Sequence, residues 1–382
     1  MSRVLLIVFV LGLSACSSFG GKSKVDPPAE VPDFEPQLQV ERLWKVSVGA
    51  SAEEAAPALG IAMVGGRLYT ASAKGRVVAI DGETGAELWR QKTPYRFSTG
   101  AGIGGDTMLL GTRDGEIVAL STGDGQERWR VMLSSEVSAV PAVSGGIAAV
   151  RTLDGRVVGL NLADGSRRWV FDGSIPSLTL RGTSAPVIHE GLVIAGFDNG
   201  RLAGLLLTDG QLVWEQAVSV PSGRSEIERL VDIDGDLRVL GDSLYAVNYQ
   251  GNLGRFAVGT GTPIWSREIS SYTGLDVGGD GVYVSDEKSH VVAFDRASGA
   301  SLWTQDRLYK RQLTAPEVAG DAVVVGDAEG YLYWLSRDDG RLLARYRVGR
   351  DGLAARPLAV ADILYALDRG GDLVALTVSE KD

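Results

Sequence analysis

The chain has 382 residues, of which 45% are hydrophobic and 23% are charged, with 50 glycines and a formal net charge of −10. An acidic chain without a run of Lys or Arg is not expected to bind the phosphate backbone of a nucleic acid. Its single cysteine, Cys16, excludes an internal disulfide.

The first residues read as a targeting segment that is not part of the fold. Arg3 precedes an apolar stretch over 4–11, which is too short for a membrane-spanning helix of about 20 residues. The next residues, Leu13-Ser14-Ala15-Cys16, resemble the lipobox of bacterial lipoproteins. The resemblance implies a signal peptide over 1–15 and acylation of Cys16. An ordinary signal peptide with a chance cysteine is the alternative.

Residues 17–38 are rich in Ser, Gly, Pro, Lys and acidic residues, a composition typical of flexible linkers. We therefore expect 16–38 to comprise the lipidated cysteine and a flexible tether, and 39–382 to form the folded domain. Ser17, in place of Asp, resembles the residue that follows the cysteine in lipoproteins sorted to the outer membrane. This resemblance implies a lipid anchor on the periplasmic face of that membrane.

Beyond the tether the chain repeats a unit of about 40 residues. A turn residue is followed 14 positions later by a tryptophan in six repeats, and by Ala344 in a seventh. The six tryptophans are Trp89, Trp129, Trp169, Trp214, Trp265 and Trp303. The chain ends at Asp382, before an eighth such position, whereas Trp44 lies ahead of the first repeat. Eight repeats with the last completed from the N-terminus predict a closed ring.

The unit over 138–172 contains the features of four short strands. Small and apolar segments are separated by Gly145-Gly146, by the hairpin pair Asp154-Gly155 and by a turn at 163–165. This pattern predicts an all-β, eight-bladed β-propeller with four antiparallel strands per blade. The tryptophans are interpreted as wedges between blades, and the turn aspartates as turn formers with no role in metal binding.

The repeat resembles the quinoprotein-like propeller family, whose units carry an Asp-x-x-Thr-Gly-x-x-x-Trp-like signature, as in 81–89. This resemblance raises the alternative of a pyrroloquinoline-quinone-dependent dehydrogenase. Such enzymes use an adjacent cysteine pair, a bound Ca²⁺ and a catalytic Asp, whereas the lone cysteine here lies in the lipobox. His189 and His290 fall in different repeats. We therefore expect no enzymatic activity, no cofactor and no metal.

Length variation is confined to the connections from one outer strand to the next inner strand. The two connections that flank the fourth blade span 17 and 23 residues from the tryptophan to the inner strand. Because all such connections emerge on one face of a propeller, two enlarged neighbours predict a partner-binding face. The first contains Leu178, Leu180 and Arg181, and the second contains Asp232 and Asp234. Apolar anchors beside charged residues are typical of interfaces, although Arg181 pairing with Asp232 or Asp234 within the loops is the alternative.

A lipobox, a short tether and one eight-bladed propeller together resemble the BamB family, the lipoproteins of the β-barrel assembly machinery. The specific stretches are 178–186, 226–234 and 325–334. The resemblance implies a scaffold whose loop residues Leu178, Leu180, Arg181, Asp232 and Asp234 contact the periplasmic POTRA domains of BamA, the barrel insertase.

The resemblance further implies that the chain helps to insert unfolded outer-membrane barrel proteins. Direct contact with such substrates, by pairing with an exposed strand edge, is a secondary hypothesis. The chain departs from the family at Gly235-Asp236-Leu237, where a Thr and a Pro often follow the second Asp. The departure concerns the geometry after Asp234 and leaves both acidic residues in place.

Overall fold

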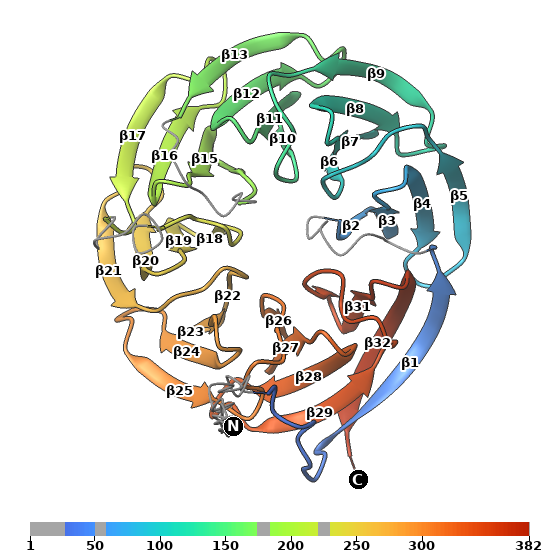
Figure 1. Cartoon of the computed structure of the whole chain (residues 1–382), viewed down its shortest axis with the longest axis vertical. Coiled ribbons are helices and arrows are strands. Elements are labelled where there is room, and N and C mark those ends of the chain that lie inside the picture. The colour runs from blue at the N-terminus through green and yellow to red at the C-terminus, as the bar shows by residue number, and fades with distance from the viewer. Residues whose placement is uncertain (1–26, 50–58, 174–183, 221–229, 382) are drawn as a thin grey trace, which may run out of the picture.

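The computed structural model describes residues 27–49, 59–173, 184–220 and 230–381. Its strands form eight four-stranded antiparallel sheets arranged as blades around a ring (Figure 1). The prediction of an all-β, eight-bladed propeller is confirmed. Within these ranges no helix has the length and apolar character needed to cross a bilayer.

Each of blades 1 to 4 is a meander of four consecutive strands, from the inner to the outer side of the ring. Blade 1 contains β2 (Ile61–Val64), β3 (Arg67–Ala71), β4 (Arg76–Asp81) and β5 (Glu87–Lys92). Blade 2 contains β6 (Gly102–Gly104), β7 (Thr107–Gly111), β8 (Glu116–Ser121) and β9 (Glu127–Met132). Blade 3 contains β10 (Ala142–Ser144), β11 (Ile147–Arg151), β12 (Arg156–Asn161) and β13 (Arg167–Asp172). Blade 4 contains β14 (Val187–His189), β15 (Leu192–Gly196), β16 (Arg201–Leu206) and β17 (Leu212–Ala217).

Blades 5 to 7 repeat this order, and blade 8 takes its outer strand from the start of the chain. Blade 5 contains β18 (Arg238–Leu240), β19 (Ser243–Val247), β20 (Asn252–Ala257) and β21 (Pro263–Glu268). Blade 6 contains β22 (Leu275–Gly278), β23 (Gly281–Ser285), β24 (Val291–Asp295) and β25 (Ser301–Gln305). Blade 7 contains β26 (Glu317–Ala319), β27 (Ala322–Gly326), β28 (Tyr331–Ser336) and β29 (Leu342–Arg347). Blade 8 contains β30 (Leu358–Val360), β31 (Ile363–Leu367), β32 (Asp372–Glu380) and β1 (Leu38–Ser47).

The ring is closed as the repeat count predicts. The N-terminal strand β1 pairs antiparallel with the C-terminal strand β32, and Trp44 lies opposite Ala375. This pairing satisfies the hydrogen-bonding edge that the last three strands of the chain would otherwise expose.

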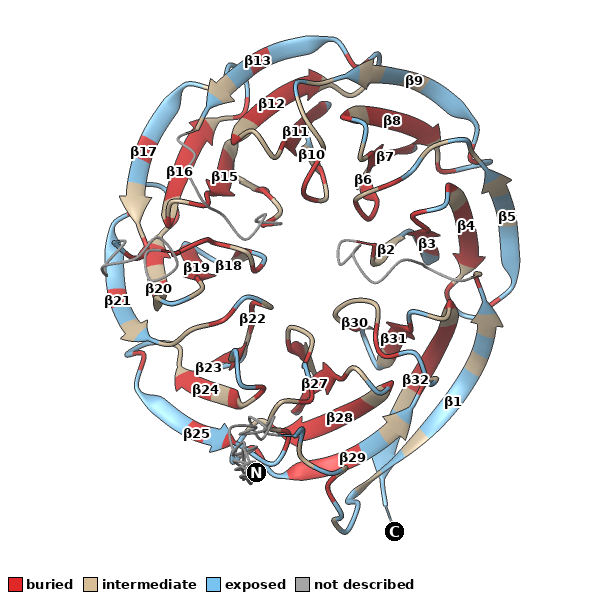
Figure 2. Cartoon of the chain, viewed as in Figure 1, coloured by how far each residue is buried: buried red, intermediate tan, exposed pale blue. Residues whose placement is uncertain are grey.

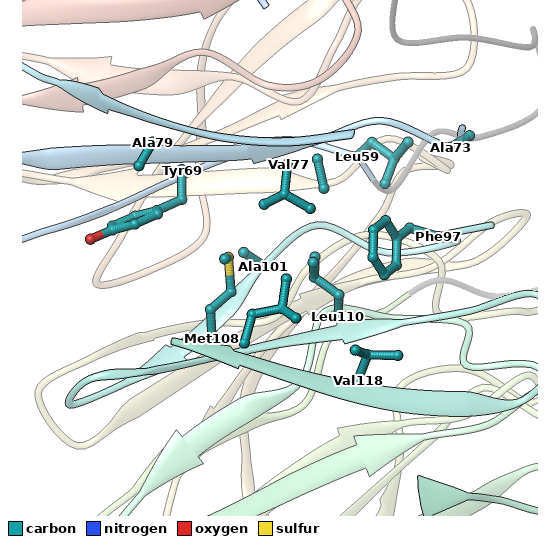
Figure 3. Packing of buried hydrophobic residues seen from close by; sticks show 12 residues of the cluster. Leu59, Tyr69, Ala73, Val77, Ala79, Phe97, Ala101, Met108, Leu110 and Val118 are labelled. Atoms are coloured by element: carbon teal, nitrogen blue, oxygen red, sulfur yellow. The ribbon is translucent and has the colours of Figure 1, made fainter. Parts of the chain in front are cut away.

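Burial follows the position of a strand in its blade (Figure 2). The two middle strands are buried on both faces because each blade packs between two neighbours, and they read as continuous apolar runs such as Val77–Ile80. Outer strands such as β5 alternate exposed and partly buried residues. Between blades 1 and 2, Tyr69 and Val77 face Met108 and Leu110 across one of these interfaces (Figure 3).

Seven blades have a tryptophan on the outer strand. In six of these blades the residue opposite it on the third strand is Gly or Ala. The cross-strand pairs are Trp44–Ala375, Trp89–Ala79, Trp129–Ala119, Trp169–Gly159, Trp214–Gly204, Trp265–Arg255 and Trp303–Ala293. Each indole packs on the turn of the next blade. The Trp89 ring covers Gly125, whose φ of +73° suits glycine, and its N–H donates to the Thr122 carbonyl at 2.9 Å.

Blade 7 exchanges the two members of this pair. Trp334 lies on β28, is 1% exposed, and faces Ala344 on β29. The next blade has no turn between its third and outer strands, because β32 and β1 are the two ends of the chain. A tryptophan at 344 would therefore find no turn glycine to cover. In blade 7 the indole is therefore on β28, opposite the position that carries a tryptophan in the other blades.

Residues 27–37, which we name the strap, lie along the outer side of blade 7 before β1 begins (Figure 1). The Ala29 N–H donates to the Tyr309 carbonyl at 2.9 Å, and the Gln37 N–H donates to the Leu343 carbonyl at 2.8 Å. The composition of this segment predicts a flexible tether, but the structure holds it against the propeller. The reason is a set of arginine contacts from residues about 280–310 positions later.

Candidate partner-binding site

The two long connections of the predicted partner face lie between blades 3 and 4 and between blades 4 and 5. Their central parts, 174–183 and 221–229, lie outside the described residues, and with them the predicted contacts Leu178, Leu180 and Arg181. The structure describes Asp232, Asp234 and the ends of both connections. The described part of the site consists of these ends and of the residues of blades 3 to 5 that contact them, which we name the platform.

The end of the second connection, residues 230–237, packs into the propeller. Leu230, Val231, Ile233 and Leu237 are all buried, with exposures between 0% and 7%. Asp232 is 0% exposed, and its carbonyl accepts from the Tyr249 N–H at 3.0 Å. The predicted contact residue Asp232 thus has no surface in the free protein, whereas Asp234 is partly exposed.

One asparagine clamps both ends of this connection. Asn248, 0% exposed, accepts from Ser219 Oγ at 3.0 Å on the outgoing side. Its Nδ2 donates to the Val231 carbonyl at 3.0 Å on the returning side. Leaving a buried amide without its hydrogen-bond partners is energetically costly. The two hydrogen bonds of Asn248 therefore hold the two ends of the connection at a fixed separation. The sequence pattern did not single out Asn248, which directly follows β19.

A buried charge cluster joins blades 3, 4 and 5 beneath the same connections; it comprises Arg151, Asp198, Asp232 and Asp234. Arg151, at the end of β11, is 1% exposed and forms an ion pair with Asp198, which follows β15. The guanidinium also lies 5.8 Å from the centre of the Phe197 ring. A buried ion pair of this kind fixes the relative position of two blades, since removing one partner leaves an uncompensated charge.

The electrostatics of the charge cluster act mainly on Asp234. Burial, and then the negative charges of Asp232 and Asp198, raise the pKa of Asp234 to about 7, against the opposing charge of Arg151. Asp234 therefore titrates near neutral pH, far from the usual range of a carboxyl group. The repeat pattern could not predict that these four residues lie together, because they come from three different repeats.

An exposed apolar residue marks the outgoing end of the second connection. Val220 is 76% exposed, the highest value among the large hydrophobic residues in the described ranges. It directly follows the buried Ser219. A single exposed apolar side chain is common on protein surfaces and by itself identifies no interface.

The inner strands of blades 5 to 8 carry a second charged group, the inner-strand cluster of Arg238, Asp276, Glu317 and Arg356. Arg238 pairs with Asp276 at 3.0 Å, and Arg356 pairs with Glu317 at 2.6 Å and with Asp276 at 3.5 Å. Asp276 also accepts from the Val318 N–H at 2.8 Å. These contacts join neighbouring inner strands, so we interpret this cluster as structural.

The two histidines considered as metal or cofactor ligands lie in different blades. His189 lies on β14 in blade 4, and His290 lies in blade 6, where Nδ1 is 2.8 Å from Asp286 Oδ2 and the ring stacks on Tyr309. In the part of the chain that the structure describes, no three His, Cys, Asp or Glu side chains are grouped to hold a metal ion.

Comparison with known proteins gives a consistent family. The family model described as "Outer membrane protein assembly factor BamB" matches residues 37–99 and 84–305. A curated protein of that name from Pseudomonas aeruginosa is 49% identical over 373 residues, covering 98% of each chain. The crystal structure of BamB from Moraxella catarrhalis superposes with a TM-score of 0.81 at 30% identity, covering 89% of this chain and 100% of that one.

A more distant likeness concerns the fold alone. The quinohemoprotein alcohol dehydrogenase from Comamonas testosteroni superposes with a TM-score of 0.71 at 12% identity. The match covers 90% of this chain and 77% of that chain. At this level of identity the shared propeller carries no information about catalysis.

Proposed function

Because this chain belongs to the BamB family of outer membrane protein assembly factors, we propose that it binds the POTRA domains of a BamA-like insertase through its two long connections. Acylated Cys16 holds it at the periplasmic face of the outer membrane. The propeller acts there as a non-catalytic scaffold that assists the insertion of β-barrel proteins.

The platform beneath the two connections is the observation that supports this proposal. Asn248 clamps the ends of the second connection, and the pair Arg151–Asp198 joins the two blades between which the first connection runs. Rigid stems lower the entropy that a loop loses when a partner binds. A loop sequence carried on such stems is suited to recognition.

The predicted contact residues take different roles in this proposal. Leu178 and Leu180 are the apolar anchors, and Arg181 supplies charge beside them. Asp234, partly exposed, borders the contact surface. Asp232 acts as a positioning residue, because it is fully buried and its backbone carbonyl holds the returning stem.

The test measures binding of the mature chain to purified insertase POTRA domains by calorimetry. Leu180→Asp is expected to weaken binding about thirtyfold or more, since losing a central anchor costs about 2 kcal/mol or more. The melting temperature should remain close to that of the parent chain.

A matched control is available on an exposed outer strand. Leu302 on β25 is 53% exposed, so Leu302→Asp makes the same chemical change on an exposed strand of blade 6. Binding by this variant should equal that of the parent. Absence of binding by the parent, or equal losses for both variants, contradicts the proposed interface.

A further inference from the structure

The strap contacts the propeller along its whole length. Arg311 Nη1 donates to the Ala29 carbonyl at 2.8 Å, Arg345 donates to the Pro32 carbonyl at 2.7 Å, and Arg307 donates to the Asp33 carbonyl at 2.6 Å. At its end, the Lys381 N–H donates to the Gln37 carbonyl at 2.9 Å. Three arginines therefore donate hydrogen bonds to backbone carbonyls of one extended segment.

The central arginine of this set is rigidly held. Arg311 is 4% exposed and lies 2.8 Å from both Asp327 Oδ2 and Glu329 Oε2. Asp327 also accepts from the Tyr333 hydroxyl at 3.0 Å. A guanidinium fixed by two carboxylates presents its remaining N–H group in a set direction. The strap carbonyl at Ala29 meets that group.

Apolar packing adds to the polar contacts. Pro32 is buried, and Phe34 packs against the core between blades 6 and 7, with the Arg345 guanidinium 5.9 Å from its ring centre. The strap thus lies where blade 7 carries Ala344 in place of an outer tryptophan.

From these contacts we propose that the strap makes the outer rim of blades 6 and 7 the side of the propeller held next to a phospholipid bilayer. The inference rests on the acylation of Cys16 in the proposed function. With the strap in place, Ala29, two residues after Pro27, is held beside Tyr309 and Arg311.

The length of chain ahead of the strap limits the orientation. Eleven residue steps separate Cys16 from Pro27, and in any conformation they span at most about 36–40 Å. A compact body of this chain length has a radius of gyration of about 21 Å, which corresponds to a diameter of about 54 Å. The rim of blades 6 and 7 therefore cannot point directly away from the membrane.

Without the strap this limit disappears. The 22 steps from Cys16 to Leu38 span up to about 73–79 Å, which exceeds the diameter of the propeller. The strap therefore excludes the inverted orientation. Because β13 lies across the ring from β29 (Figure 1), blade 3 is the side of the propeller that this arrangement holds farthest from the bilayer.

The test attaches a fluorophore to single cysteines of the full acylated chain in vesicles that contain quencher lipids. Thr304→Cys on blade 6 and Val170→Cys on blade 3 form a matched pair, since each residue is exposed and directly follows the outer tryptophan of its blade. Acylated Cys16 does not react with the label. We expect quenching at position 304 to exceed that at 170 at least about twofold.

Two further variants test whether the strap causes the difference in quenching between positions 304 and 170. Inserting eleven Gly/Ser residues ahead of Pro27 leaves the strap intact and doubles the reach, so the difference should shrink. Arg307→Ala combined with Arg345→Ala releases the strap without touching buried Arg311, and it should do the same. The amides of Ala29 and Gln37, which donate to propeller carbonyls, should exchange at least about tenfold more slowly in the parent chain than in this double variant.

Equal quenching at the two positions in the parent chain, or unprotected amides at Ala29 and Gln37, overturns the proposal. If the chain does not float with vesicles, the acylation on which it rests is absent. Failure of the POTRA interface is measured separately by calorimetry with the mature chain, so the two proposals fail independently.

Discussion

The seam between blades 7 and 8 and the region of blades 3 to 5 depart from the same repeat in different ways. At the seam the chain ends meet, the indole moves from position 344 to Trp334, and the strap covers the outer strand. In blades 3 to 5 the tryptophans keep their positions, while buried Arg151 and Asn248 carry the stems of long connections. The first departure closes the ring, and the second supports the binding surface that we propose.

In our proposal, the residues that stabilise the ring are thus different from those that support partner binding. The seam uses apolar packing and backbone hydrogen bonds, which are favourable in the isolated chain. The loop region buries charges whose desolvation is costly, and it gains fixed geometry in return. Four changes test this contrast, in order of expected effect.

Removing β1, by deletion of 38–47, should abolish cooperative folding, since β32 loses its partner strand and blade 8 loses Trp44. Deletion of 17–26, which precedes the strap, should leave the melting temperature unchanged. Circular dichroism during heating measures both. Similar melting curves for the two deletions would contradict closure by β1.

The exchanged pair of blade 7 is tested by Trp334→Ala, which should destabilise the fold by about 3–5 kcal/mol. Adding Ala344→Trp restores the composition of an ordinary blade, yet it should give no recovery because blade 8 has no turn to receive the indole. Urea unfolding compares the single and double variants. Recovery to within about 1 kcal/mol of the parent would show that the missing turn is not the cause.

Asn248→Ala should cost about 2–3 kcal/mol, because Ser219 and the Val231 carbonyl lose their buried partner. It should also weaken POTRA binding, since the stems of the second connection separate. The control, Asn199→Ala, removes one turn contact to the Arg201 N–H and should cost about 1 kcal/mol or less. Chemical denaturation and calorimetry provide the two readouts; equal effects of both variants would remove the clamp role.

The smallest effect concerns pH. The pKa of Asp234 is about 7 in the folded chain, above its ordinary value of 3.8, so the folded state binds the proton more tightly than the unfolded state. Its contribution to stability is therefore full below about pH 4, falls as pH rises toward 7, and is constant above that value.

Asp234→Asn should remove this part of the pH dependence. Relative to the parent, the variant should gain on the order of 1 kcal/mol at pH 8 compared with pH 5, after allowance for partial solvent exposure. Unfolding midpoints at pH 5, 6.5 and 8 measure the slope. An unchanged slope would mean that Asp234 is ionised at neutral pH in the folded chain.

Much of the fold was predictable because its signal is local and periodic. The 14-residue interval from turn to tryptophan sets the hairpin register, and the position of Trp44 predicts the closing strand. The same periodicity identified the two long connections between blades 3 and 4 and between blades 4 and 5. The repeat did not predict where the indole of blade 7 lies. A pattern along the outer strand shows Ala344 but not Trp334, which lies opposite it on the adjacent strand.

The sequence by itself determined the number of blades and the segments that interrupt the repeat, since each depends on residues within about 40 positions of one another. The count of repeats, with Trp44 ahead of the first, determined the closure of the ring. Only the tertiary structure decided which side chains support those segments. Arg151 and Asp198 are 47 positions apart, and Arg345 and Pro32 are 313 apart. Closing a ring brings distant blades and both chain ends together, and such contacts follow from the path of the backbone rather than from any local pattern.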